Sequence, residues 1–155
     1  ANLVRAFGNG APTASGVILQ FPFYAGIFGV INGTGLGDWL GGLFVQVATT
    51  ETYPLIVYIY SGFVNIFVPS GGSKWLIEAP YLLPAATELA VSPTTTLLAY
   101  CYGDSTSNLI QPFWAIPILT VTRMKFGDIL GYSGLIALVL FLVTAVAMLI
   151  IPAML

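Results

Sequence analysis

The sequence predicts an all-α integral membrane protein, and its composition carries that prediction. Of 155 residues only four are Lys or Arg and six are Asp or Glu, which is 6% of the chain, whereas a soluble domain carries about 25%. Hydrophobic residues make up 57%, and the mean hydropathy is +0.94. Because a soluble fold of this length needs polar side chains to cover its surface, we place the chain in a lipid bilayer.

The same counts exclude several functional classes. Four basic residues cannot form a phosphate-binding patch, so nucleic acid is not an expected partner. The chain has no His and a single Cys, Cys101, which leaves no nitrogen and sulfur cage for a metal and no triad for nucleophilic catalysis. An intramembrane enzyme is disfavoured because Asp104 has no second Asp at a suitable spacing. We therefore expect a protein that is not an enzyme and uses no cofactor.

The expected helices follow from the lengths of the uncharged segments, since about 20 apolar residues cross the hydrocarbon core as a helix. Residues 12–33 carry no charge and predict a spanning helix with a kink at Pro22. In residues 37–50 the apolar positions recur at helical spacing, and polar residues gather toward the end. That pattern predicts a short helix in the membrane interface or beside the bundle.

Residues 53–89 predict a re-entrant hairpin. Two apolar runs, 53–69 and 75–89, are each too short for a comfortable span and are joined by a polar, Gly-rich turn. Such a turn is tolerated at membrane depth only where protein or a water-filled cavity surrounds it. If both runs spanned instead, the two crossings would cancel, so the topology of the remaining chain does not separate the two interpretations.

Two further spans complete the expected frame. Residues 93–121 predict a broken spanning helix, whose middle we expect to be unwound by the polar insert 103–108. Residues 129–152 hold no charge and predict the last spanning helix.

The basic residues give this frame an orientation. Arg5 precedes the first expected span, and Arg123 and Lys125 precede the last one. Between Arg5 and this pair the chain crosses the membrane once, forms a hairpin that enters and leaves on the same side, and crosses back. All three basic residues therefore lie on the same side of the membrane. The positive-inside rule makes that side cytoplasmic.

The first group of polar candidates surrounds the hairpin turn and comprises Asn65, Ser70, Gly71, Gly72 and Ser73. A Gly-rich turn that opens into a helix directs backbone N–H groups and the positive end of the helix dipole at a ligand, which suits a carboxylate. Lys74 adds a positive charge there, or it pairs with Glu78 one helical turn further on. In the alternative interpretation the turn is a plain surface loop, with Lys74 in water.

The second group lies in and after the polar insert. An ionisable residue within an apolar region is costly unless it is paired or hydrated, which makes Asp104 a candidate for binding the coupling ion. The neighbouring hydroxyls and amides are hard oxygen ligands that suit Na⁺ near Asp104, or a proton, rather than a transition metal. The candidates around Asp104 are Ser105, Thr106, Ser107, Asn108 and Gln111. In the alternative interpretation the insert is a loop outside the membrane.

Residues 19–27, 64–72 and 103–115 resemble the bacterial short-chain fatty acid transporter family of the AtoE type. The resemblance covers nearly the whole chain, which looks like the C-terminal part of a longer family member. It implies secondary active transport of small monocarboxylates, such as acetoacetate or butyrate, coupled to H⁺ or Na⁺ by symport. It also implies a multi-pass protein of the bacterial cytoplasmic (inner) membrane.

The family resembles part of a wider superfamily of ion transporters. The resemblance implies inverted repeats, each with a re-entrant hairpin and a discontinuous helix, homodimers, and an elevator motion. This chain would then be one repeat, and the missing N-terminal repeat would supply the other half of the site. Two positions depart from the expected pattern: Ile66 replaces an aromatic residue and Lys74 an uncharged polar one.

One alternative from a different class stays open. The chain would then be a non-transporting helix-bundle or assembly subunit of a membrane complex, with no site of its own. Its Gly- and Ser-rich turns would only allow close packing between helices.

Overall fold

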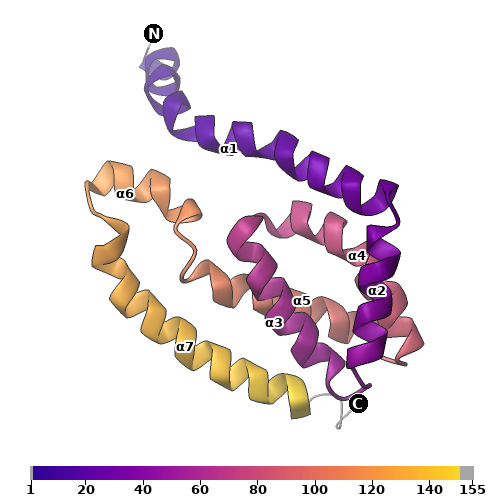
Figure 1. Ribbon diagram of the computed structural model, residues 1–155. Helices are drawn as coiled ribbons and strands as arrows, with labels where there is room; N and C mark the ends of the chain where they lie inside the picture. The colour runs from indigo at the N-terminus through magenta and orange to yellow at the C-terminus, as the bar shows by residue number, and fades with distance from the viewer. Residues whose placement is uncertain (1, 151–155) are drawn as a thin grey trace.

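The computed structural model describes residues 2–150, without the side chains at 13–17, 20, 114, 116–117 and 120, and this part of the chain is helical with no strand. The all-α prediction is therefore confirmed for it. Figure 1 shows the elements in order: α1 (Asn2–Gly33), α2 (Leu36–Val47), α3 (Tyr53–Phe67), α4 (Gly71–Glu88), α5 (Pro93–Asn108), the 3-10 turn η1 (Phe113–Ala115), α6 (Ile116–Thr122) and α7 (Phe126–Ile150).

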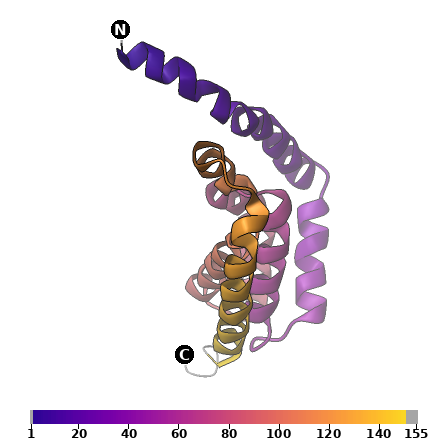
Figure 2. The ribbon, with the colours of Figure 1, turned by 90° about the vertical axis from the view of Figure 1, so that its left-hand side faces the viewer.

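Helix α1 begins earlier than the predicted span 12–33. It is 32 residues long and holds Pro12 and Pro22 in its interior, where proline bends helices. Its N-terminal part turns away from the other helices (Figures 1 and 2), whereas its C-terminal part leads into α2 through Gly35, with φ of 74°. Leu3 and Phe7 are 80% and 78% exposed, so the projecting part of α1 presents apolar side chains outward.

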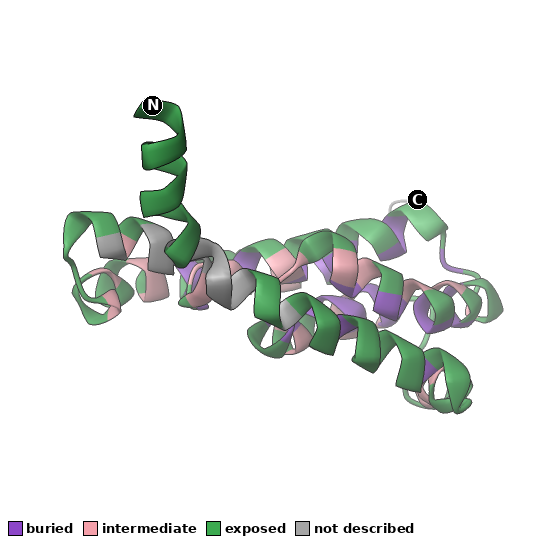
Figure 3. Ribbon diagram, turned by 90° about the horizontal axis from the view of Figure 1, so that it is seen from above, coloured by how far each residue is buried: buried purple, intermediate pink, exposed green. Residues whose placement is uncertain are grey.

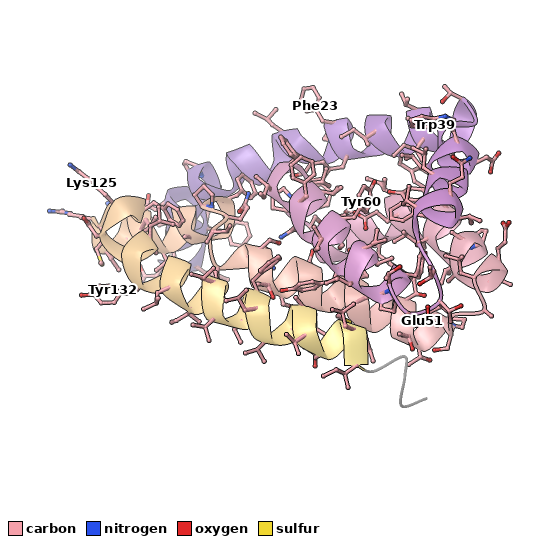
Figure 4. The ribbon with its side chains drawn as sticks, turned by 60° about the horizontal axis from the view of Figure 1, so that its bottom comes forward. Phe23, Trp39, Glu51, Tyr60, Lys125 and Tyr132 are labelled. Atoms are coloured by element: carbon pink, nitrogen blue, oxygen red, sulfur yellow. The ribbon has the colours of Figure 1, made fainter. Side chains whose placement is uncertain are left out.

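The centre of the molecule is formed by α3, α4 and α5. Helix α3 makes its most extensive contact with α5, and α4 packs against α2 and α5. Buried residues gather in these helices (Figure 3). Tyr residues fill much of the core, and their hydroxyls are paired: Tyr53 donates to the Leu82 carbonyl at 2.6 Å, and Tyr60, which points inward in Figure 4, pairs with Tyr81 at 2.9 Å.

The interruption in the predicted broken helix lies later than expected. The polar insert 103–108 is helical and forms the last turns of α5, so the expectation that it unwinds the helix is wrong. The helix ends at Asn108, and η1 begins after Pro112. Proline has no N–H to donate and disfavours the helical conformation in the residue before it. Gln111 completes the break, since its Oε1 accepts a hydrogen bond from the Phe113 N–H at 2.7 Å.

Within the described residues, α7 is the one helix that is long and apolar enough to cross a membrane by itself. Few of its side chains are buried. It covers most of the predicted span 129–152, of which residues 151–152 lie outside the described part. Shorter apolar helical segments occur at Phe21–Gly33 and Tyr53–Phe67. The spanning role of 12–33, the interfacial role of 37–50 and the re-entrant role of 53–89 stay predictions.

Candidate functional site

The candidate site forms where α3 and α5 cross. At this point the backbones touch: a Cβ added to Gly103 would lie 2.3 Å from the Tyr58 carbonyl oxygen and 2.9 Å from the Gly62 nitrogen. Only residues without a side chain allow so close an approach. The crossing holds Ser61 and Asn65 of α3 against the last turns of α5.

Asn65 ties the end of α3 to the polar insert. The side chain is fully buried, and its Nδ2 lies within hydrogen-bonding distance of three acceptors. These are the Asp104 carbonyl at 3.2 Å, Ser107 Oγ at 2.9 Å and Asn108 Oδ1 at 2.8 Å. Ser107 in turn donates to the Gly103 carbonyl at 2.9 Å. The structure thus brings together four of the predicted candidates, one from the hairpin and three from the insert.

Lys74 lies at the centre of the site. It is fully buried, with its Nζ 3.8 Å from Glu78 Oε1 and 3.4 Å from Asp104 Oδ1. It donates to the Ser61 carbonyl at 3.0 Å and to Ser61 Oγ, and it sits 4.1 Å from the centre of the Tyr100 ring. The predicted Lys74–Glu78 pair is confirmed, and the alternative with Lys74 in water is wrong.

Lys74, Glu78 and Asp104 form a charged cluster that is short of hydrogen-bond donors. Among the described residues, the buried side-chain atoms with no hydrogen-bond partner are Asn65 Oδ1, both Glu78 carboxyl oxygens and Asp104 Oδ1. All are oxygens. When its three members are ionised, the charged cluster carries a net charge of −1. An unpaired buried charge is costly, so the site is suited to taking up one further cation.

The turn between α3 and α4 closes over this cluster. The Gly71 carbonyl accepts a hydrogen bond from the Tyr100 hydroxyl, and the open side of Gly71 faces Asp104 Oδ2, which would lie 3.5 Å from an added Cβ. Ser70 is extended and makes no side-chain hydrogen bond to cap α4. Gly72 is exposed, with nothing within 4 Å of an added Cβ. Ser73 lines a pocket between α4 and α1.

Three residues predicted in or near the insert lie apart from the charged cluster. Ser105 is exposed. Thr106 faces the other side of α5, where its Oγ1 accepts from the Tyr58 hydroxyl at 3.3 Å. Gln111 is buried and stabilises the start of η1. Thr106 also borders a largely apolar pocket of about 360 Å³ between α3, α5 and α7.

Sequence reasoning missed Ser61 and Tyr100, which hold Lys74, and the contact between Gly62 and Gly103. Lys74 bonds to Ser61 across 13 positions of sequence, a separation that reflects no helical or strand period. The small residues carried the only available signal, because glycines within apolar helices often mark close helix contacts. Among the described residues, no group of three His, Cys, Asp or Glu is placed to hold a metal ion, and Na⁺ near Asp104 stays a prediction.

Apolar helices, one of them long enough to span a membrane, surround a buried charged cluster, an arrangement consistent with a membrane protein of the transporter class. Residues 1–153 match the family model described as short chain fatty acid transporter, and the chain belongs to that family. The resemblance seen in the sequence is thereby confirmed. The family is one of transporters, not of enzymes.

Two curated relatives agree with this assignment. Over 129 residues the chain is 38% identical to a candidate short-chain fatty acid transporter of Escherichia coli (strain K12) and 37% identical to one of Haemophilus influenzae. These alignments cover 83% of this chain but 29% of each relative, so the chain spans less than a third of their length. A candidate basic amino acid antiporter of E. coli, YfcC, is 29% identical over 57% of this chain and 18% of its own length. No solved structure matches the chain.

Proposed function

We propose that the protein carries out secondary active transport of short monocarboxylates, such as acetoacetate or butyrate, coupled to H⁺ or Na⁺ in the bacterial cytoplasmic (inner) membrane. The single observation that carries the proposal is the charged cluster, which is buried between the N-terminus of α4 and the last turns of α5. Burying three ionisable groups between helices is costly in free energy, and a helix bundle with a purely structural role gains nothing from it.

The depth of the hairpin supports a site within the membrane. Phe63 and Ile66, near the end of α3, share a pocket with Gly134 and Leu138 of α7. At 1.5 Å per residue, Gly134 and Leu138 lie about 12 and 18 Å from the start of α7, well inside the helix. If α7 crosses the bilayer, the α3–α4 turn stands near its middle, which is the arrangement of a re-entrant hairpin.

Substrate binding follows from the free groups at this turn. The first N–H groups of a helix have no partner within it, and Ser70 does not cap them. The segment 70–73 is therefore proposed to bind the substrate carboxylate together with Asn65, Ser107 and Asn108, which lie together at the end of α3. The charged cluster around Asp104 is proposed to bind the coupling ion. Because it carries a net charge of −1 when fully ionised, a carboxylate enters favourably only with a cation.

The orientation and the assembly extend this proposal. The start of α1 and the α6–α7 turn, where Lys125 is labelled, lie toward the same end of the molecule (Figures 1 and 4). This placement supports a common side of the membrane for Arg5, Arg123 and Lys125, and the positive-inside rule makes that side cytoplasmic. Because the relatives are more than three times as long as the matched segment, an N-terminal repeat is proposed to supply the other half of the site, within a homodimer.

The test is uptake of labelled butyrate by the intact protein, with all of the chain that accompanies these residues in the cell, in proteoliposomes under an imposed Na⁺ or H⁺ gradient. We expect gradient-driven accumulation that is lost in Asp104→Asn and kept in Asp38→Asn, a matched change at an exposed residue of α2. If the correctly inserted protein accumulates no short monocarboxylate under either gradient, the proposal fails. The assembly-subunit interpretation would then be favoured.

A further inference from the structure

The two carboxylates of the charged cluster have unequal surroundings. Glu78 is fully buried, and neither of its oxygens has a hydrogen-bond partner. Its nearest cation is Lys74 Nζ at 3.8 Å. Asp104 lies closer to that ammonium, at 3.4 Å, its side chain keeps 15% of its exposure, and its Oδ2 accepts from Asn108 Nδ2 at 3.2 Å. A negative charge on Asp104 therefore has more stabilising contacts in the structure than one on Glu78.

The groups that face Glu78 from the neighbouring helices do not change this. They are Lys74 and Tyr81 on α4, Tyr60 and Ser61 on α3, and Tyr100 and Asp104 on α5. Lys74 is the only cation among them. A single ammonium cannot neutralise two carboxylates, and it is closer to Asp104.

We propose that Glu78 is the proton-binding residue of this transporter, and that Lys74 completes a neutral pair with Asp104 while Glu78 is protonated. The inference rests on the proposed transport function and narrows its coupling ion to H⁺. The proton adds to one carboxylate oxygen of Glu78 and gives a neutral carboxylic acid. When that proton leaves, Lys74 becomes shared between two carboxylates.

Charge balance then couples the proton to the substrate. With Glu78 ionised and no substrate, the site carries a net charge of −1. With Glu78 protonated and one monocarboxylate bound, the net charge is again −1. The site therefore crosses the membrane with the same net charge, and the same electrostatic cost, in the empty and the loaded state. Substrate without a proton would bring the net charge of the site to −2. This predicts an electroneutral symport of one proton with one monocarboxylate.

The first test measures the proton itself and does not depend on transport. Infrared difference spectroscopy of the intact protein, reconstituted in lipid, detects the carbonyl stretch of a protonated carboxyl group. We expect such a band at neutral pH, where exposed carboxyl groups are ionised, and its loss as the pH is raised. It should shift when glutamate is labelled with ¹³C at its carboxyl group, disappear in Glu78→Gln, and persist in Glu88→Gln, a matched change at an exposed residue of the same helix.

The second test measures coupling. One pH unit supports up to about tenfold accumulation at one proton per substrate. We expect the wild-type protein and Glu88→Gln to approach this ratio, and Glu78→Gln to stay near equal concentrations on both sides while still exchanging labelled for unlabelled butyrate.

The outcomes of these tests separate the two proposals. A band that does not shift with labelled glutamate, or that persists in Glu78→Gln, overturns the role of Glu78 whether or not the variant folds. Tenfold accumulation by Glu78→Gln overturns that role while the transport function stands. Absence of any uptake by the wild-type protein overturns the transport function itself, and the infrared band then still decides whether Glu78 holds a proton.

Discussion

The close crossing of α3 and α5 can be tested by a single methyl group. In Gly103→Ala the new Cβ would lie 2.3 Å from the Tyr58 carbonyl oxygen, 2.9 Å from the Gly62 nitrogen and 3.2 Å from Ser61 Cβ. The first distance is about 1 Å shorter than an ordinary van der Waals contact. Two of the three atoms belong to the backbone of α3 and cannot rotate away, so the helices must separate.

The cost of that separation has two parts. Overpacking a well-packed contact costs about 1–3 kcal/mol. A shift of about 1 Å would also stretch the bonds that cross the interface, from Ser61 Oγ to the Tyr100 carbonyl at 3.2 Å and from Asn65 Nδ2 to the Asp104 carbonyl at 3.2 Å. Each is worth about 0.6 kcal/mol by comparison with bonds between membrane helices. We expect a total loss of about 3 kcal/mol.

Thermal unfolding of the purified protein in detergent would measure this loss. Gly62→Ala should cost less, because its Cβ would lie 3.2 Å from the nearest atom, the Gly103 carbonyl oxygen. Gly131→Ala in α7 is the matched control, since an added Cβ there meets nothing within 4 Å, and it should be neutral or slightly stabilising. If Gly103→Ala unfolds at the same temperature as Gly131→Ala, the backbone contact between α3 and α5 is not a feature of the protein.

Two further predictions concern stability and the turn. Lys74→Met leaves the Asp104 carboxylate without its counter-charge and should cost about 3–5 kcal/mol in the free energy of unfolding. Lys74→Met combined with Asp104→Asn should recover part of this loss, and equal stabilities of the two variants would contradict the charged cluster. Gly72→Cys, where an added Cβ meets nothing within 4 Å, should react with a water-soluble thiol reagent in a protein whose exposed Cys101 is replaced by Ser, and butyrate should slow that reaction; labelling at an unchanged rate would place the carboxylate elsewhere.

The sequence was sufficient to predict those features of the structure that depend on residues close together in the sequence. The turn before α4 and the Lys74–Glu78 pair follow from the Pro and Gly positions and from the spacing of four residues on one helix face. The error at the insert 103–108 has the same local origin. Polar residues were expected to unwind the helix, but they bond within α5 and to Asn65, and the helix ends only where Pro112 forces it to.

The contacts between helices could not be predicted in this way. The pairing of Lys74 with Asp104 and its bond to Ser61 depend on how α3, α4 and α5 are rotated and shifted relative to one another. That register is set by the contact of Gly62 with Gly103, two residues whose importance is visible only once both helices are in place.

The positions of the helix ends explain why the two carboxylates of the charged cluster differ. Asp104 Oδ2 faces Gly71, the first residue of α4, so its charge lies at the positive end of that helix dipole. Glu78 lies two turns further into the same helix, beyond the range over which the dipole acts. The interruption before α4 thus stabilises one carboxylate as an anion and leaves the other dependent on a shared ammonium or on a proton. A continuous helix through the turn would remove this asymmetry and, with it, the physical basis for coupling a proton to an anion.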